Sequence, residues 1–421
     1  MNKVAVALAA DSAVTVRTQT GDKIYNTANK LYMLSRSRPV GIMVYGSAEL
    51  MGVPWETIIK CYRRKLADAR STTLARYAAQ FIKFLDYGNP LFPQRMQEQH
   101  LRAVVLAIFK AIKSGIVDRV KAAQARGPVC GAEIGKIVEA VVSEHRKVLS
   151  GCKDLPHLPP RYSAQVVKRH RKLIDDASRQ VFEKLPMTGG TRRHLVDLVA
   201  CFIRKDKFTD PHSGVVVAGF GESENFPSVR HYWLEGVAGG RLKYKEQKEM
   251  RVDVGNDAAV QAFAQSEMVT TFMEGINPFY SKALNHYLAE LIKGFSSCMI
   301  DKCIGLKGKE RELMARRFGQ ASEQLVREFK KGIDVHKHQK HVAPIIRTVA
   351  VLPKDELAAM AESLVNLTSF KRRVTLDSET VGGPIDVAVI SKGDGFVWIK
   401  RKHYFKPELN PHFVANYYKA R

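Results

Sequence analysis

The first apolar segment of the chain, at residues 4–16, reads VAVALAADSAVTV. Valine and leucine alternate with alanine in its first half, the polar pair Asp11 and Ser12 interrupts the pattern, and a second short run ends at Val16. Alternation over so few residues is typical of β-strands, because successive side chains of a strand point to opposite faces. The segment therefore predicts two short strands joined at Asp11.

The same reasoning separates strands from helices along the rest of the chain. Short apolar runs at 31–34 and 40–45 continue the strands, and apolar side chains then recur at helical spacing after Pro54 and again from Leu74. Strands return at 213–245, and a last pair flanks the turn sequence KGDG near the C-terminal end. This order contains no regular strand–helix–strand alternation. It disfavours a parallel doubly wound sheet and predicts an α+β fold of two antiparallel sheets covered by helices.

The composition excludes fibrous, disordered and membrane-spanning classes. Of 421 residues, 45% are apolar and 26% are charged, and no apolar run approaches the roughly 18 residues of a membrane helix. The first residues lack the pattern of a secretory signal. The six cysteines are spread out with no CxxC pair, which indicates neither a zinc site nor a disulfide framework and favours a reducing cytoplasm. We expect no metal and no cofactor.

Net charge is the one extreme feature of the composition. The chain has 67 Lys+Arg against 42 Asp+Glu, which gives +25. Between residues 101 and 200, 19 basic residues stand against 9 acidic ones. Such a field attracts polyanions. Weak nucleic-acid binding through this segment is one interpretation, and a solvated basic surface is the other.

Several blocks of sequence carry a resemblance to a known family. In chain order they are AADSAVT at 9–15, KLYML at 30–34, GIMVYGSA at 41–48, VVVAGF at 215–220, HYWL at 231–234 and VGGPIDV at 381–387. With these blocks the chain resembles the proteasome β-type subunits, including the bacterial HslV peptidase, which are N-terminal nucleophile hydrolases.

The resemblance implies both a fold and a chemistry. The fold is an αββα sandwich of two antiparallel sheets, here with large helical insertions. In that family a threonine at the mature N-terminus attacks a peptide carbonyl with its own amine as base, a lysine stabilises the alkoxide, an aspartate holds the lysine, and a backbone N–H at a glycine turn forms the oxyanion hole. By position, the resemblance assigns these last three roles to Lys30, Asp11 and Gly46.

The nucleophile of the family has no counterpart in this sequence. Residues 1–10 contain no threonine, and the later threonines follow Asp11. The family's Asp-x-x-Ser-Gly-Gly motif also matches poorly, since residues 378–383 read SETVGG. We expect the chain as written to be inactive. Either a nucleophile strand precedes these residues in a longer product, or the protein is a catalytically dead relative in which Asp11 and Lys30 form a buried ion pair.

The leading hypothesis is a cytoplasmic, proteasome-like hydrolase that cleaves peptide or other amide bonds, self-associates into a ring and has no membrane partner. The alternatives are a non-catalytic scaffold of the same fold and a nucleic-acid-associated protein that uses its basic insertions. The expected organisation is a first part of the sandwich at 1–86, a basic helical insertion at 87–187, a second part of the sandwich at 188–275, a helical and basic insertion at 276–346, and a closing helix and strand hairpin at 347–421.

Three histidines, His336, His338 and His341, lie in the basic segment 334–341. Their spacing could bring imidazoles near a metal ion. The interleaved lysines and the absence of a nearby cysteine favour a solvated basic loop instead.

Overall fold

The computed structural model describes residues 1–18, 21–67, 69–86, 88–210, 212–302, 308–375 and 381–418. The chain divides into two compact units. The first unit comprises residues 1–28, 251–391 and 397–421, and the second comprises 29–250 and 392–396. The fold is mixed α+β with antiparallel sheets, as the sequence predicts.

The second unit is built on an antiparallel sheet with the strand order β10-β9-β8-β5-β4. Its strands are β4 (Leu31–Met33), β5 (Val40–Tyr45), β8 (Ser213–Gly219), β9 (Ser228–Ala238) and β10 (Arg241–Glu246), and the short β11 (Met250–Arg251) also pairs with β9. A small separate ladder joins β6 (Glu49–Leu50) and β7 (Val53–Pro54). The strands expected at 31–34, 40–45 and 213–245 are confirmed.

Two helices cover one face of this sheet. They are α1 (Trp55–Leu66) and α2 (Leu74–Leu85), where the periodicity predicts them. The side chain of Thr73 caps α2 by accepting a hydrogen bond from the backbone N–H of Arg76 at 3.3 Å. Alternate strand residues such as Val44, Val215 and Leu234 share one buried apolar cluster with the helices. The period-two pattern of the strands thus turns one set of side chains towards the helices.

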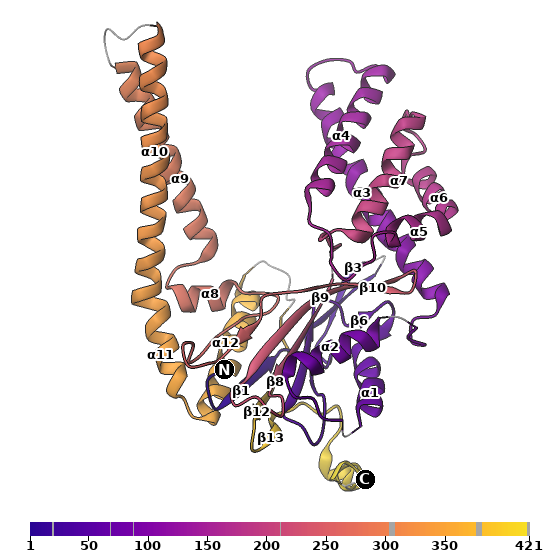
Figure 1. Ribbon diagram of the computed structural model, residues 1–421, viewed down its shortest axis with the longest axis vertical. Coiled ribbons are helices and arrows are strands. Elements are labelled where there is room, and N and C mark those ends of the chain that lie inside the picture. The colour runs from indigo at the N-terminus through magenta and orange to yellow at the C-terminus, as the bar shows by residue number, and fades with distance from the viewer. Residues whose placement is uncertain are drawn as a thin grey trace. The chain divides into compact units, whose positions relative to one another are not determined.

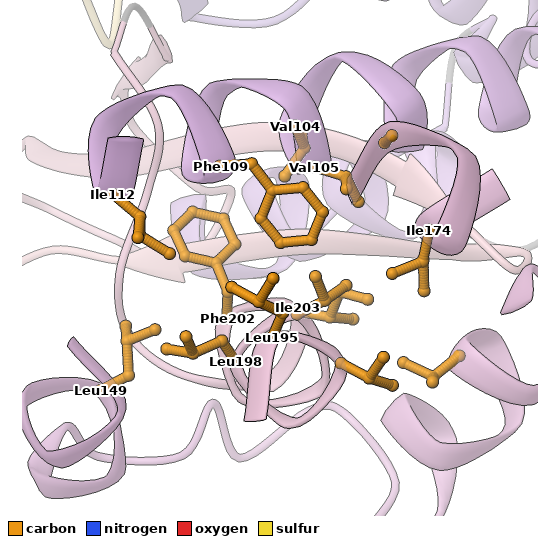
Figure 2. Packing of buried hydrophobic residues seen from close by; sticks show 14 of the residues in the cluster. Val104, Val105, Phe109, Ile112, Leu149, Ile174, Leu195, Leu198, Phe202 and Ile203 are labelled. Atoms are coloured by element: carbon orange, nitrogen blue, oxygen red, sulfur yellow. The ribbon is translucent and has the colours of Figure 1, made fainter. Parts of the chain in front are cut away.

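A helical module follows the sheet helices in the second unit. Its helices are α3 (Gln94–Gln124), α4 (Gly131–Gly151), α5 (Tyr162–Arg169), α6 (Arg171–Phe182) and α7 (Gly189–Arg204). Figure 2 shows their side chains interdigitating, with Phe109 and Ile112 of α3 facing Leu195 and Phe202 of α7. The core of the module therefore extends past residue 187 and includes the apolar face of α7.

A buried ion pair joins the module to the sheet. Lys243 of β10 lies 2.8 Å from the carboxylate of Glu235 of β9, and both side chains are almost fully buried. The same ammonium donates to the backbone carbonyls of Phe202 and Lys207 at 2.7 and 2.5 Å. The other oxygen of Glu235 accepts from the backbone N–H and hydroxyl of Thr209. Both charges therefore have the partners that burial demands.

The first unit contains a three-stranded sheet with the order β1-β12-β13. The strands are β1 (Ala5–Ala10), β12 (Asp386–Ser391) and β13 (Gly395–Lys400), and β1 pairs antiparallel with β12. The helices α11 (Ala343–Val351) and α12 (Lys354–Val374) share a buried cluster with Ala5, Val387 and Val389. A hairpin of β2 (Val14–Thr18) and β3 (Gly21–Tyr25), a 3-10 turn (Pro407–Leu409) and α13 (Pro411–Tyr418) complete the strands and C-terminal elements.

The remaining helices of the first unit form a long hairpin (Figure 1). After α8 (Glu267–Glu274), the antiparallel pair α9 (Pro278–Lys302) and α10 (Gly308–Lys337) leads into a π-helical turn (His338–Val342). The prediction of a loop at 334–341 is therefore wrong, because α10 and the π-helical turn run through these residues.

The described residues contain no cluster of three or more His, Cys, Asp or Glu side chains able to hold a metal. Among the described helices, none has the length and apolar character of a membrane span.

Candidate active site

Asp11 lies in the turn that ends β1, in the first unit. Its carboxylate accepts backbone hydrogen bonds from Ala13 at 3.0 Å and from Gly382 at 3.1 Å. The neighbouring Ser12 is fully buried, and its backbone N–H donates to the carbonyl of Gly382 at 3.0 Å while its hydroxyl donates to that of Pro384 at 2.5 Å. The structure thus joins the Asp11 turn to the Gly-Gly segment far along the chain, and both belong to the blocks that carry the family resemblance.

Gly383 shows why this segment needs glycine. Its φ is +76°, and a Cβ at this position would lie 2.6 Å from the Cβ of Asn26. A backbone hydrogen bond of 3.0 Å from the N–H of Ala28 to the carbonyl of Ser12 brings the loop that follows β3 to the same turn. Three segments therefore converge on Ser12 and Gly383, and a side chain at 383 would both strain the backbone and clash. Residues 376–380, which include the poorly matching serine, lie outside the described residues.

Lys30 and Gly46 lie at neighbouring strand ends in the second unit. Lys30 immediately precedes β4, and its carbonyl accepts a hydrogen bond from the backbone N–H of Val44 at 2.8 Å. Gly46 immediately follows β5, two residues beyond Val44. Its φ is +83°, and a Cβ would lie 2.2 Å from the carbonyl oxygen of His212. Any other residue at 46 would displace this turn.

The three residues assigned by the resemblance are thus divided between the units. Asp11 belongs to the first unit, and Lys30 and Gly46 belong to the second. Lys30 and Gly46 lie close together on adjacent strands, and the roles assigned to them stay predictions. The ion pair between Asp11 and Lys30 stays a prediction.

A hydrogen-bonded aromatic cluster lies beside Gly46 on the sheet of the second unit. The hydroxyl of Tyr45 lies 2.5 Å from Nε2 of His231 and accepts from Nε1 of Trp233 at 3.0 Å. The strand register explains this arrangement, because Tyr45 of β5, Gly214 of β8 and Trp233 of β9 are consecutive partners across the sheet. Gly214 makes room for the tyrosine ring, since a Cβ there would lie 2.0 Å from it.

The environment of this cluster keeps both ionisable groups neutral at pH 7. Burial lowers the pKa of His231 to about 4, and the nearby His212 adds a smaller effect in the same direction. Burial raises the pKa of Tyr45, which the hydrogen bond from Trp233 partly opposes. A neutral imidazole can accept a hydrogen bond from the Tyr45 hydroxyl at Nε2. The cluster is therefore a fixed donor–acceptor chain that ends one residue before the Gly46 turn.

Sequence reasoning did not select Tyr45, His231 and Trp233 as site residues. In the sequence analysis these three residues belong to expected strands within the resembling blocks, and they have no assigned role. The usable signal was their alternation: His231 and Trp233 are two residues apart on an expected strand, so they share a face. The pairing with Tyr45 depends on the register across β8, which no local pattern specifies.

No family model matches the chain, and no curated protein or solved structure matches it either.

Proposed function

We propose that this chain carries the fold and part of the active site of an N-terminal nucleophile hydrolase of the proteasome β-type, which cleaves peptide or other amide bonds. The observation that carries the proposal is the hydrogen bond of 3.1 Å from the backbone of Gly382 to the carboxylate of Asp11. It links Asp11, to which the resemblance assigns a role in the active site, to Gly382 of the resembling block at 381–387, 371 residues further along the chain. The antiparallel ladder of β1 and β12, in which Ala10 pairs with Asp386, brings these two resembling blocks together.

The two units support the proposed αββα sandwich separately. Each contains a sheet with helices on one face. The opposite face of each sheet also has buried apolar side chains: Val6 and Leu8 of β1 in the first unit, and Met43 and Val216 in the second. Sheets that are apolar on both faces are what a helix–sheet–sheet–helix stack requires.

The proposed chemistry assigns one role to each residue. A threonine supplied from outside residues 1–421 attacks the substrate carbonyl through its hydroxyl, and its α-amine, with an ordinary pKa of about 8, takes the proton. The amine then gives this proton to the leaving nitrogen as the amide C–N bond breaks, and water hydrolyses the resulting ester to release the acid and the threonine. Lys30 stabilises the developing alkoxide, Asp11 orients Lys30, and the backbone N–H at the Gly46 turn stabilises the tetrahedral oxyanion. The five cysteines within the described residues carry free thiols. Free thiols fit the proposed cytoplasmic location, because the cytoplasm is reducing.

The test is to supply the nucleophile. A strand of about six residues that begins with threonine is placed before Met1 and released by a site-specific protease, so that the threonine has a free amine. We expect the unextended chain to be inert and the extended chain to cleave fluorogenic peptide amides. Lys30→Ala should abolish the activity, and Lys83→Ala, which removes an exposed lysine of α2, should not.

The outcomes separate the hydrolase from the scaffold. Activity that survives Lys30→Ala would contradict the assigned mechanism. An extended chain that folds but stays inert towards a broad panel of peptides and amides would favour a non-catalytic scaffold of the same fold.

A second candidate function is nucleic-acid binding by the helical module. Lys168, Arg169, Arg171 and Lys172 are all exposed where α5 meets α6. Phosphate contacts by such side chains make affinity fall steeply with salt. The paired substitution Lys168→Gln with Lys172→Gln should lower both the affinity for duplex DNA and its salt dependence. An affinity unaffected by salt would exclude this function.

A further inference from the structure

The α9–α10 hairpin is held together by a narrow contact. Ser296 of α9 and Ser322 of α10 touch through their hydroxyls. Ser322 is the one buried residue of the described α10, and α9 has none. The ion pair between Lys337 and Glu274, at 3.1 Å, closes the base of the hairpin. Two helices alone therefore leave most of each helix surface exposed.

One face of α9 is apolar, aromatic and exposed. Tyr280, Leu284, Tyr287, Leu291 and Phe295 have exposed fractions of 64, 46, 72, 69 and 65%. Their spacing of four, three, four and four residues places them on one face of the helix, and we call these five residues the α9 stripe. A contiguous exposed stripe of this kind marks an interaction surface.

We propose that the α9 stripe binds the α9 stripe of a second copy of this chain, with the two helices antiparallel and the two-fold axis at Leu291. Tyr287 and Phe295 lie four positions to either side of that residue, so the half of the stripe at 287–295 is symmetric about it, whereas Leu284 and Tyr280 lie opposite Cys298 and Lys302. An antiparallel two-fold pairing therefore brings Tyr287 of one copy against Phe295 of the other, twice, and Leu291 against itself. A two-fold interface requires this self-complementarity.

The charges of α9 agree with an apolar partner. None of the five stripe residues is charged. Glu290 and Lys293, the charged residues next to the centre, lie 3.6 Å apart in an ion pair within the helix. Asp301, at the far end, pairs with Arg311 of α10. An acidic or basic partner would find no complementary charge in the stripe, whereas a second stripe matches it.

The area of the stripe is sufficient for a dimer. A large apolar or aromatic side chain can bury about 150–250 Å², so five side chains exposed by about half to three quarters offer on the order of 500–700 Å² per copy. Two copies would bury roughly 1,000–1,400 Å², which reaches the lower end of specific interfaces. The stripe can therefore support a dimer that dissociates on dilution.

The first experiment measures molar mass by light scattering and sedimentation over a range of concentrations of the full chain. We expect a dimer that dissociates on dilution. Tyr287→Asp combined with Phe295→Asp should halve the mass at concentrations where the native chain is dimeric. The control is Leu313→Asp on α10, which is 52% exposed and outside the stripe, and it should leave the mass unchanged. A native chain that stays monomeric at high concentration, or a dimer unaffected by the double variant, overturns the proposal.

The second experiment tests the geometry. Leu291→Cys, in a background with Cys130, Cys298 and Cys303 changed to serine, should cross-link copy to copy with a short bis-maleimide. His286→Cys is the control, because a two-fold axis at 291 separates the two copies of residue 286 by ten helical positions, or roughly 15 Å along the axis. Cross-linking at 286 rather than at 291 overturns the proposed pairing. A complex with a mass above that of a dimer, sensitive to the double variant, overturns it as well.

Discussion

The helical module α3–α7 and the α9–α10 hairpin both contain helices of more than 20 residues, yet only the module encloses a core. In the module, Val105, Phe109, Ile112 and Leu195 are fully buried. In the hairpin, Ser322 is the one buried residue of the described α9 and α10. Amphipathic helices thus appear in both regions with opposite consequences for their apolar faces.

The difference follows from the number of helices. Five helices of the module can surround their apolar stripes on several sides, whereas a pair covers each stripe from one side only. The module is therefore expected to contribute stability to the chain, and the hairpin to contribute a surface. The following predictions test this contrast from the largest expected effect to the smallest.

The largest contrast is expected from deletions. Replacing residues 280–335 by a short Gly-Ser linker should leave one cooperative thermal transition, with a midpoint within a few degrees of the native value, since Ser322 is the one buried side chain of the described α9 and α10. Removing 87–187 should abolish cooperative unfolding or solubility, because α7 would keep Leu195, Leu198 and Phe202 without partners. Calorimetry measures both.

The opposite pattern would refute the contrast. A hairpin deletion that prevents folding would show that α9 and α10 contribute a core of their own. A soluble, cooperatively unfolding chain without 87–187 would show that α7 can be covered by other residues of the second unit.

The next effect concerns two lysines. Lys243→Met should destabilise the chain by about 3–5 kcal/mol, because it leaves Glu235 buried without its cation. Lys282→Met on α9 should change the free energy of unfolding by less than about 0.5 kcal/mol, as expected for an exposed position. Urea unfolding of both variants at one dilute protein concentration gives the comparison. A cost below about 1 kcal/mol for Lys243→Met would indicate that the buried pair is not closed.

A matched pair of leucines, one in the module and one in the hairpin, tests the same contrast with a smaller expected loss in the free energy of unfolding. Leu195→Ala should cost about 2–5 kcal/mol, because the removed side chain leaves a cavity in the module core. Leu291 is 69% exposed, and Leu291→Ala should cost less than about 0.5 kcal/mol for the dilute monomer. Equal costs for the two substitutions, measured by urea unfolding, would mean that α7 is not part of the core or that α9 is covered within the monomer.

Local patterns predicted the elements better than their grouping. The apolar spacing after Pro54 and Leu74 suffices for α1 and α2, since each stripe lies within one helix. The membership of α7 in the module core depends on contacts with α4 and α5 across many residues, which no local pattern contains. The π-helical continuation of α10 was missed because its charged, His-rich composition is equally typical of a loop.

At the candidate site, too, the sequence identifies single residues but not the contacts between them. Asp11, Lys30 and Gly46 came from the resemblance, and the strands place Lys30 beside Val44, close to Gly46. The contact of Asp11 with Gly382 spans almost the whole chain. The Tyr45–His231 hydrogen bond requires the register of three strands. Pairing between distant strands is fixed by tertiary packing, so the sequence could supply candidates but not their partners.

The smallest expected effect is a change in the pH dependence of stability, caused by the partly buried His231 of the sheet. The α9 stripe contains no ionisable group of this kind. Burial lowers the pKa of His231 to about 4 from an ordinary value near 6.5, so between these pH values the unfolded chain binds a proton that the folded chain does not. Stability from this group is therefore complete above pH 6.5 and is lost as pH falls towards 4. His231→Gln keeps an acceptor for the Tyr45 hydroxyl and removes the titration, so the loss of stability on acidification should be smaller in the variant. Urea unfolding at several pH values measures the difference, and NMR titration of the His231 ring measures its pKa directly. A ring that titrates near 6.5 in the folded chain would mean that the imidazole is solvated, and the donor–acceptor chain beside Gly46 would then not exist in solution.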